Sequence, residues 1–298
     1  ISSKVKQVSF DSLEQPNENN IQTLKLKISN SLNFTVCQEV RIKDECGSLA
    51  AHLARLLAWF LDVNRNLRDG DVLSVVYERL SDKGRLKILK LNFKSRYLGK
   101  TLEANYYNGT GMKYGGYFDQ NGKEIAQRIE GKQSPITEYK EITSLPGDFR
   151  KGRRGHSGTD FKADVGTPIR ATFDGRVTRT SWNVRANGYC IEIDHPKHKV
   201  KTRYLHLSRV LVKRGQYIKQ GETIGESGNT GRSFAPHLHY EIRSRGNNRI
   251  VYNPFNFKHH RTYRRNISSE ENAKFQKVIR GYDLLLQNNR TGENNQIG

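Results

Sequence analysis

The 298-residue sequence predicts a mainly β protein with minor α content: an antiparallel β-sheet domain, an upstream α+β domain and a C-terminal helix. Short apolar runs separated by glycine-containing turns recur between about 155 and 243, which is typical of antiparallel sheet. Helical spacing of apolar residues is clearest at 49–61 and after residue 268. The predicted domains are 1–131 (divisible at about residue 48), 132–258 and 259–298.

The upstream region begins with a period-two alternation at 21–28 that predicts a strand. A helix is predicted at 49–61, where alanine and leucine dominate, with Ser48 as its N-cap. Four further strands are predicted, at 72–77, 86–93, 102–107 and 114–118. This region shows no recognisable catalytic constellation.

Residues 132–154 lack sustained periodicity and end in a basic run at 150–154, so they are predicted to form a linker or loop. Ser268, followed by glutamates, predicts a helix that runs into Leu286, with a disordered polar tail beyond it. Between them, strands are predicted at 168–173, 175–181, 188–194, 200–206, 216–219, 222–226 and 237–243.

The net charge of +21 is the strongest global feature of the composition. A field of this size attracts polyanions such as nucleic acid, an anionic membrane surface or an acidic cell-wall polymer. No helix-turn-helix, zinc-finger or RNA-binding signature accompanies the charge, so a specific nucleic-acid reader is not expected. No run of eighteen or more apolar residues predicts a membrane span. The chain begins at Ile1 without a leader, and we expect a processed or truncated form whose signal or anchor is not visible.

Three cysteines bear on the compartment of the protein. Cys37 and Cys46 are nine residues apart around a turn-like segment at 43–47. The sequence leaves two alternatives for this pair. The two cysteines form a disulfide in an oxidising compartment, or they remain as two free buried thiols. Cys190 stands in an apolar strand pattern, and we expect a small core residue there.

Histidines are arranged in a pattern that points to a metal. His237 and His239 stand two residues apart in an alternating run, so both imidazoles would project from one face of a strand. His156 lies four residues before Asp160 in a glycine-containing segment, and His206 ends another apolar strand. Two histidines and a carboxylate leave a tetrahedral zinc with one open position, as catalytic zinc requires. Together these motifs predict a metal site.

Each motif alone is weak, because His-x3-Asp and His-x-His also occur on ordinary surfaces. The remaining histidines fit structural roles. His52 is expected to be a packing or surface residue of a helix. His195 and His198 are expected to be solvated in a hairpin loop. His259 and His260 stand in a basic run, and we expect this run to contribute surface charge.

Six motifs resemble the lysostaphin or LytM-type zinc metallopeptidases, which cut peptidoglycan cross-bridges. They are HSGTD (156–160), GTPIRA (166–171), DGRV (174–177), YLHLS (204–208), GNTG (228–231) and PHLHYE (236–241). Their order and spacing make the resemblance specific, and it covers about residues 142–257. It implies a LytM-type β catalytic domain.

The resemblance also implies particular roles. One Zn2+ would be bound by His156, Asp160 and His239. His206 and His237 would be catalytic, acting on the metal-bound water and on the developing oxyanion. Which of these two histidines is the general base is left open.

A weaker resemblance lies upstream. The segments LLAWFLD (56–62), NLRDGD (66–71) and VVYE (75–78) are similar to the domain that precedes the peptidase in Gram-negative cell-shape and division endopeptidases. In those envelope proteins, upstream domains can cover the peptidase groove and hold it latent. Family members often carry a longer Ser-x-Phe-Gly-x-Arg segment before the first histidine, whereas this chain has GDFRKGRR at 147–154. The rim of the groove is therefore expected to be shorter and more basic.

The sequence thus predicts a periplasmic or secreted zinc endopeptidase acting on peptide cross-links of peptidoglycan, with D,D-endopeptidase and carboxypeptidase action both open. Anionic envelope polymers are further expected partners, and salt should weaken wall binding. The alternative is a non-catalytic wall-binding protein with a degenerate peptidase fold that activates other wall hydrolases. The bond cleaved, an inhibitory role of the upstream region and the oligomeric state are not fixed by the sequence.

Overall fold

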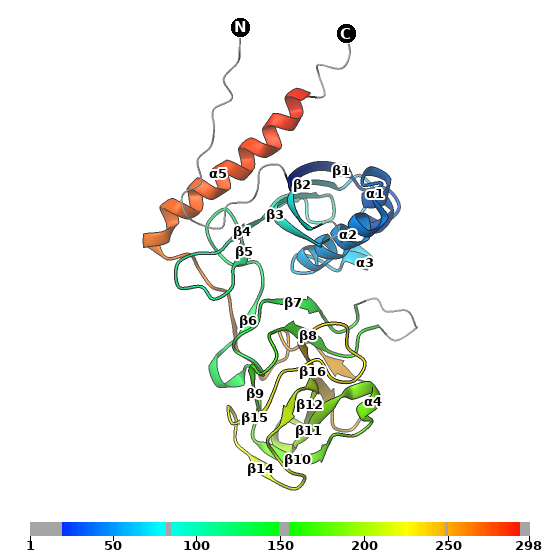
Figure 1. Ribbon diagram of the computed structural model, residues 1–298, viewed down its shortest axis with the longest axis vertical. Coiled ribbons are helices and arrows are strands. Elements are labelled where there is room, and N and C mark those ends of the chain that lie inside the picture. Colours follow the sequence, from blue (N-terminus) through cyan, green and yellow to red (C-terminus); the bar gives the residue numbers. More distant parts are fainter. Residues whose placement is uncertain (1–19, 82–84, 149–154, 248–249, 293–298) are drawn as a thin grey trace. The chain divides into compact units, whose positions relative to one another are not determined.

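The computed structural model describes residues 20–81, 85–148, 155–247 and 250–292. The chain forms two compact units (Figure 1). Unit 1 combines residues 1–126 and 265–298, and unit 2 is the continuous segment 127–264. The C-terminal helix therefore packs with the upstream strands. Among the described residues, no helix is long and apolar enough to cross a membrane.

Unit 1 is built on a five-stranded antiparallel sheet. Its strands, in spatial order, are β1 (Ile21–Lys27), β2 (Val72–Ser81), β3 (Arg85–Ser95), β4 (Lys100–Tyr107) and β5 (Gly116–Phe118). The helices of this unit are α1 (Leu32–Glu39), α2 (Lys43–Leu57), α3 (Val63–Asn66) and α5 (Ser269–Gly292). Every upstream strand that the sequence predicts is present.

The two faces of this sheet are covered by different helices. Side chains of successive strand residues alternate between the faces. Val75 of β2 therefore lies in the main core with Leu49 and Leu53 of α2. Val76 lies in a separate cluster with Tyr282 of α5. The sheet is thus enclosed between two helical layers.

The predicted helix at 49–61 begins earlier than expected, at Lys43, and ends at Leu57. Ser48 lies inside this helix, so its prediction as the N-cap is wrong, as is the turn at 43–47. Burial of one apolar face against the sheet outweighs the low helix propensity of glycine and serine in its first turns. Helix α1 was not predicted.

The cysteine pair forms a disulfide. Cys37 of α1 and Cys46 of α2 are bonded, with their Cα atoms 4.9 Å apart. This settles the choice between a disulfide and two thiols, and it links the two helices. Cys190 is a free, fully buried residue, as the sequence predicts.

The C-terminal helix begins where the sequence predicts it. The Ser268 hydroxyl accepts a hydrogen bond from the backbone N–H of Glu271 (3.3 Å), which satisfies a donor of the first turn. The helix continues past Leu286 to Gly292. The disordered tail predicted beyond Leu286 is therefore wrong for residues 287–292, and its remainder, 293–298, lies outside the described residues.

Unit 2 contains a large antiparallel sheet. Its strands, in spatial order, are β14 (Tyr217–Ile218), β10 (Gly175–Thr180), β11 (Tyr189–His195), β12 (Val200–Leu207), β16 (His237–Ser244), β8 (Thr159–Lys162) and β7 (Glu141–Ser144), with β17 (Val251–Tyr252) also pairing with β16. A smaller sheet contains β13 (Arg209–Val210), β15 (Thr223–Glu226) and β9 (Pro168–Arg170), and β18 (Thr262–Tyr263) pairs with β6 (Arg128–Ile129). One short helix, α4 (Val184–Asn187), precedes β11.

All seven strands predicted for 168–243 are present, and the mainly β, antiparallel fold class is confirmed. The two-residue strands β6, β13, β17 and β18 were not predicted, and two longer strands were also missed. β7 lies in the segment 132–154 that was predicted as a linker, and β8 follows His156. Both are four residues long, which is too short to give a clear alternation. The basic run at 150–154, with the rim predicted from it, lies outside the described residues.

The prediction that His195 and His198 are solvated is wrong for His195, which is fully buried. Its Nδ1–H donates to the Asp174 carbonyl (2.9 Å), and its Nε2 accepts from the Thr202 hydroxyl (2.7 Å). The ring of His198 packs on Phe173, with 4.4 Å between the ring centroids. The loop folds back onto the sheet because Phe173 offers an apolar surface there.

Candidate metal centre

Three adjacent strands of the large sheet carry most of the predicted site residues, since β16 lies between β12 and β8. The register places His239 of β16 opposite Asp160 of β8 and opposite Leu205 of β12. His237 stands two residues before His239 and projects from the same face. Antiparallel pairing thus brings together residues that are about 80 positions apart in the chain.

The residue at position 158, directly before β8, lies so close to β16 that only glycine fits there. A Cβ added there would lie 2.5 Å from the Tyr240 carbonyl oxygen and 2.8 Å from Nε2 of His239. Neither separation is possible for a real side chain. The glycine therefore lets the HSGTD segment lie directly against β16, which positions both His156 and Asp160.

Three donor atoms converge in the centre. Nδ1 of His239 lies 2.8 Å from Oδ1 of Asp160 and 3.1 Å from Nε2 of His156. Nε2 of His156 lies 3.2 Å from the same Asp160 oxygen. All three residues are buried, and their donor atoms lie within 4.8 Å of one another. We call this set the metal centre.

His156 and His239 each make a further hydrogen bond through the ring nitrogen that points away from the centre. Nδ1–H of His156 donates to the Leu145 carbonyl (3.2 Å), and Nε2–H of His239 donates to Glu241 (3.1 Å). In its neutral form, each imidazole therefore presents an unprotonated nitrogen to the centre. Two imidazole nitrogens and one carboxylate oxygen suit a zinc ion that keeps an open position. The residues present fit such an ion.

Electrostatics favour an ionised carboxylate in the centre. Burial acts to raise the pKa of Asp160, but hydrogen bonds from His156 and His239 outweigh it and hold the pKa well below its usual range. Burial acts to lower the pKa of His239, while its hydrogen bonds to Asp160 and Glu241 raise it to about 9. The protein thus places a positive charge, from a proton or a cation, between these carboxylates.

His206 and His237 lie beside the centre, with 4.8 Å between their ring centroids. Nδ1–H of His206 donates to the Thr230 carbonyl (2.8 Å), and that of His237 donates to the Ala235 carbonyl (2.8 Å). Because a carbonyl only accepts, each ring in its neutral form carries its lone pair on Nε2. Nε2 of His237 lies 3.7 Å from Asp160. The structure brings all five predicted site residues together.

The backbone of His206 has a φ of 64°, a left-handed conformation that is uncommon for a residue with a side chain. Thr230 holds it there, because its carbonyl accepts from the ring while its hydroxyl donates to the Leu207 carbonyl (2.6 Å). Strain of this kind is found at functional sites. Thr230 was singled out only as part of the GNTG motif, without a role.

Comparison with known proteins identifies this part of the chain. The family model for peptidase family M23 matches residues 154–251, which include all five of the residues described above. Residues 154–251 belong to peptidase family M23. The prediction of a lysostaphin or LytM-type metallopeptidase is therefore confirmed.

Curated relatives of the M23 domain include two proteins of Vibrio cholerae. The peptidoglycan DD-endopeptidase ShyC is 36% identical over 206 residues, which cover 65% of this chain and 44% of that protein. The peptidoglycan DD-endopeptidase ShyA is 34% identical, with 65% and 45% covered. The chain spans about half the length of these relatives.

A solved structure is similar to the M23 domain alone. The catalytic domain of lysostaphin from Staphylococcus simulans is 32% identical and covers 38% of this chain and 88% of that domain, with a TM-score of 0.36. Lysostaphin itself, in sequence, is 40% identical over 86 residues, which are 29% of this chain and 17% of that protein.

A groove of about 640 Å3 runs over the metal centre of the M23 domain. Both catalytic candidates, His206 and His237, line it, as do Trp182 and the fully exposed Phe234. The metal centre lies on the wall of this groove. A chain laid along the groove therefore passes the open side of the centre.

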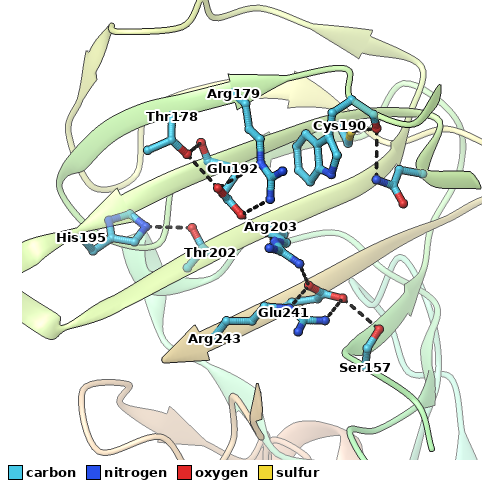
Figure 2. A network of polar contacts seen from close by, with 12 residues as sticks. Ser157, Thr178, Arg179, Cys190, Glu192, His195, Thr202, Arg203, Glu241 and Arg243 are labelled. Atoms are coloured by element: carbon cyan, nitrogen blue, oxygen red, sulfur yellow. Dashed lines mark hydrogen bonds and ion pairs between the residues drawn. The ribbon is translucent and has the colours of Figure 1, made fainter. Parts of the chain in front are cut away.

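Glu241 is a site residue that the sequence reasoning missed. It lies two positions beyond His239 on the same strand face, and it is 3% exposed. One of its oxygens accepts from His239 and from the Ser157 hydroxyl (2.8 Å), and Arg203 and Arg243 also donate to this carboxylate (Figure 2). Its i+2 spacing from His239 was the signal in the sequence, since outer carboxylates orient metal-binding histidines.

Proposed function

We propose that the chain is a zinc-dependent peptidoglycan hydrolase that cleaves the peptide cross-links of the bacterial cell wall. The convergence of His156, Asp160 and His239 in one buried set, beside two further histidines, carries this proposal. The names of the curated relatives support the substrate, because two of them are peptidoglycan DD-endopeptidases. Endopeptidase action on a D,D cross-link is therefore the favoured activity.

We assign the metal ligands as Nε2 of His156, Oδ1 of Asp160 and Nδ1 of His239. When bound there, a zinc ion would polarise the scissile carbonyl and make a nucleophile available from water at neutral pH. The Leu145 carbonyl and Glu241 hold the two imidazoles in the tautomers that this assignment needs. The chain thus contributes a donor set whose orientation is already fixed.

We assign proton transfer to His206 and His237. Burial lowers the pKa of His206 to about 4, so this ring is neutral at pH 7 and its Nε2 can accept a proton from attacking water. The imidazole that accepts the proton then carries Nε2–H, which it can return to the leaving amine. Its partner can hydrogen-bond to the substrate oxygen on which negative charge develops. Each backbone carbonyl keeps Nδ1 protonated throughout.

Charge and cysteine chemistry support an envelope location. Residues 127–264 contain 27 Lys and Arg against 12 Asp and Glu, so most of the net charge of +21 belongs to the M23 unit. Such a unit is attracted to anionic envelope polymers, and added salt weakens that attraction. The Cys37–Cys46 disulfide fits an oxidising compartment outside the cytoplasm. We therefore place the protein in the periplasm or outside the cell.

The test is digestion of purified peptidoglycan sacculi by the zinc-loaded chain, followed by mass spectrometry of the released muropeptides. Cross-linked dimers should convert to monomers, whereas shortened stems would mean carboxypeptidase action. His156→Ala and Asp160→Ala should abolish release. His52→Ala, a histidine change in unit 1, should leave it intact.

Two results would contradict the proposal. Equal release by wild type and Asp160→Ala would remove the metal centre from the mechanism. A wild-type chain that binds no zinc at neutral pH and releases nothing would instead support the non-catalytic, degenerate alternative. Metal analysis of the same samples separates these two results.

A further inference from the structure

One side chain of the groove, that of Trp182, stands in a strained part of the backbone. It belongs to the link between β10 and α4, and it lines the groove over the metal centre. Its two neighbours, Ser181 and Asn183, have φ values of 48° and 49°, in the left-handed region that residues other than glycine rarely adopt. Strain of this kind is concentrated at catalytic and binding sites. The backbone thus points to a function for Trp182.

Several contacts hold the strained link. The backbone N–H of Ser181 donates to the Cys190 carbonyl (2.8 Å). The Trp182 carbonyl accepts from Nδ2–H of Asn187 (3.0 Å) and from the Cys190 thiol (3.5 Å). The guanidinium carbon of Arg179 lies 4.3 Å from the centroid of the indole, which is a cation–π contact. The indole is therefore held in place before a ligand arrives.

Packing alone does not account for this arrangement. A tryptophan that served only the core would bury its indole, whereas Trp182 is half-buried and lines the groove. Apolar surface exposed to water is unfavourable, and a strained link that exposes it adds a second cost. A ligand that covers the exposed part of the ring offsets the first of these costs.

Two polar side chains line the groove beside this link. Asn187 donates to the Trp182 carbonyl, and its amide keeps an acceptor oxygen and a second N–H beyond this bond. Arg232 is exposed, and its backbone N–H donates to the Ala186 carbonyl (3.0 Å), which places it beside α4. This wall of the groove thus combines an aromatic ring with an amide and a guanidinium group.

The combination fits a sugar ring. A pyranose has a face of C–H groups, which an aromatic ring covers, and a rim of hydroxyl or acetamido groups, which amide and guanidinium side chains bond. An extended peptide is instead held through its backbone groups at a free strand edge. The wall at 181–187 is a link and a short helix, so it offers no such edge.

We propose that Trp182, Asn187 and Arg232 form a subsite for one sugar ring of the glycan strand. We call these three residues the sugar subsite. This inference rests on the proposed function, because the glycan is the part of peptidoglycan to which the cross-linked peptides are attached. The subsite and the catalytic candidates line the same groove, so one substrate can occupy both. The chain should therefore prefer cross-links that keep their sugars over free peptides.

The test compares two cross-linked peptide dimers as substrates of the zinc-loaded chain. One keeps its sugars, and the other has lost them and carries acetylated N-termini, so that the charges of the two are matched. The wild type should cleave the first at least about tenfold faster in kcat/KM. Binding of neutral N-acetylglucosamine oligomers to the metal-free chain is measured in parallel, since it needs no hydrolysis. Because the oligomers are uncharged, their binding should persist in high salt.

Four variants locate the preference. Trp182→Ala should remove it and abolish oligomer binding, with less than about threefold loss on the sugar-free dimer. Trp182→Tyr keeps a flat ring and should retain most of both. Arg232→Gln changes an exposed side chain outside the strained link, and it should weaken both by a few-fold. Tyr217→Ala removes an exposed ring of β14 outside the groove, and this matched control should change neither.

Each result decides between the two proposals. Equal cleavage of the two dimers by the wild type, without oligomer binding, would overturn the sugar subsite and leave the proposed function standing. Equal losses on both dimers in the Trp182 and Arg232 variants would assign these residues to peptide binding or to the fold, and would also overturn the subsite. Oligomer binding that depends on Trp182, without cleavage of either dimer, would support the subsite and overturn the proposed hydrolysis.

Discussion

Unit 2 contains two groups of histidines with different surroundings. In the metal centre, one carboxylate, that of Asp160, lies within 3.2 Å of ring nitrogens from two histidines. In the second group, the imidazoles pack on aromatic rings, and their hydrogen bonds go to backbone carbonyls and a hydroxyl. This second group, which we call the Phe173 cluster, consists of Phe173, Phe257, His195, His198, His259 and His260.

On the assignment proposed above, carboxylates, more than the number of histidines, distinguish a metal centre from a structural cluster. No carboxylate of the described residues pairs with the imidazoles of the Phe173 cluster. Burial there lowers the pKa of His195 and of His260 to about 4 each, so both rings are neutral at pH 7. His260 was predicted as surface charge, but its ring stacks on Phe173 with 5.0 Å between centroids.

The largest expected effect removes the carboxylate from the metal centre. Asp160→Asn keeps the shape of the side chain and deletes its charge, so zinc affinity should fall by at least about 10³-fold. Zinc should raise the Tm of the wild type and leave that of the variant unchanged. Metal titration followed by calorimetry or thermal melting measures both. His198→Ala, in the Phe173 cluster, should still bind one zinc per chain.

The next effect is a loss of stability in acid that comes from the Phe173 cluster. The folded pKa of His195, about 4, is below its ordinary value of 6.5, so the unfolded chain binds this proton more readily. The contribution of His195 is therefore complete above pH 6.5 and is lost as the pH falls towards 4, by about 3 kcal/mol in total. Asp174, Asp194 and His198 are the nearby titratable groups.

Denaturant unfolding at several pH values between 7 and 4.5 measures this slope. His195→Gln should reduce the proton uptake on unfolding by as much as one per molecule. A variant with an unchanged slope would show that other groups, such as His260, account for the whole effect.

The sequence predicts which residues converge at the metal centre because the relevant information is local there. Each proposed ligand stands in a short motif with fixed spacing, and the strand periodicity around His239 fixes which side chains share its face. The contacts that the sequence does not predict depend on pairing between distant strands. Glu241 acquires its role from Arg203 and Ser157, which lie 38 and 84 residues away in sequence.

The errors elsewhere have a similar origin. The start of α2 depends on contacts with the sheet of unit 1 and on the disulfide to α1, and neither is visible in a local pattern. His195 was expected in solvent because it precedes Pro196 in a polar loop, yet Phe173, more than twenty residues earlier, covers it. Tertiary contacts thus override local polarity in both cases.

A smaller effect should distinguish Glu241 from Glu192, the buried carboxylate of β11. Glu241→Gln weakens the hydrogen bond that Nε2–H of His239 donates to residue 241. Zinc affinity should therefore fall by about 10–100-fold while the fold persists. Glu192→Gln makes the same change on β11, two strands away from β16, where the carboxylate contacts arginines and not the metal centre. It should change zinc affinity by less than about threefold. Equal losses in the two variants would mean that zinc affinity follows the total charge of the sheet and not the hydrogen bond between Glu241 and His239.

The smallest expected effect tests the claim that the Phe173 cluster is purely structural. The Thr202 hydroxyl donates to Nε2 of His195 at 2.7 Å, so Thr202→Val leaves a buried acceptor without a donor. This should lower the free energy of unfolding by about 1 kcal/mol, whereas Thr202→Ser, which keeps the hydroxyl, should lower it by less. Zinc affinity and cleavage should be unchanged in both variants, because the Phe173 cluster shares no ligand with the metal centre. If either variant altered zinc affinity, the two histidine groups would be coupled, and carboxylate content alone would not separate their functions.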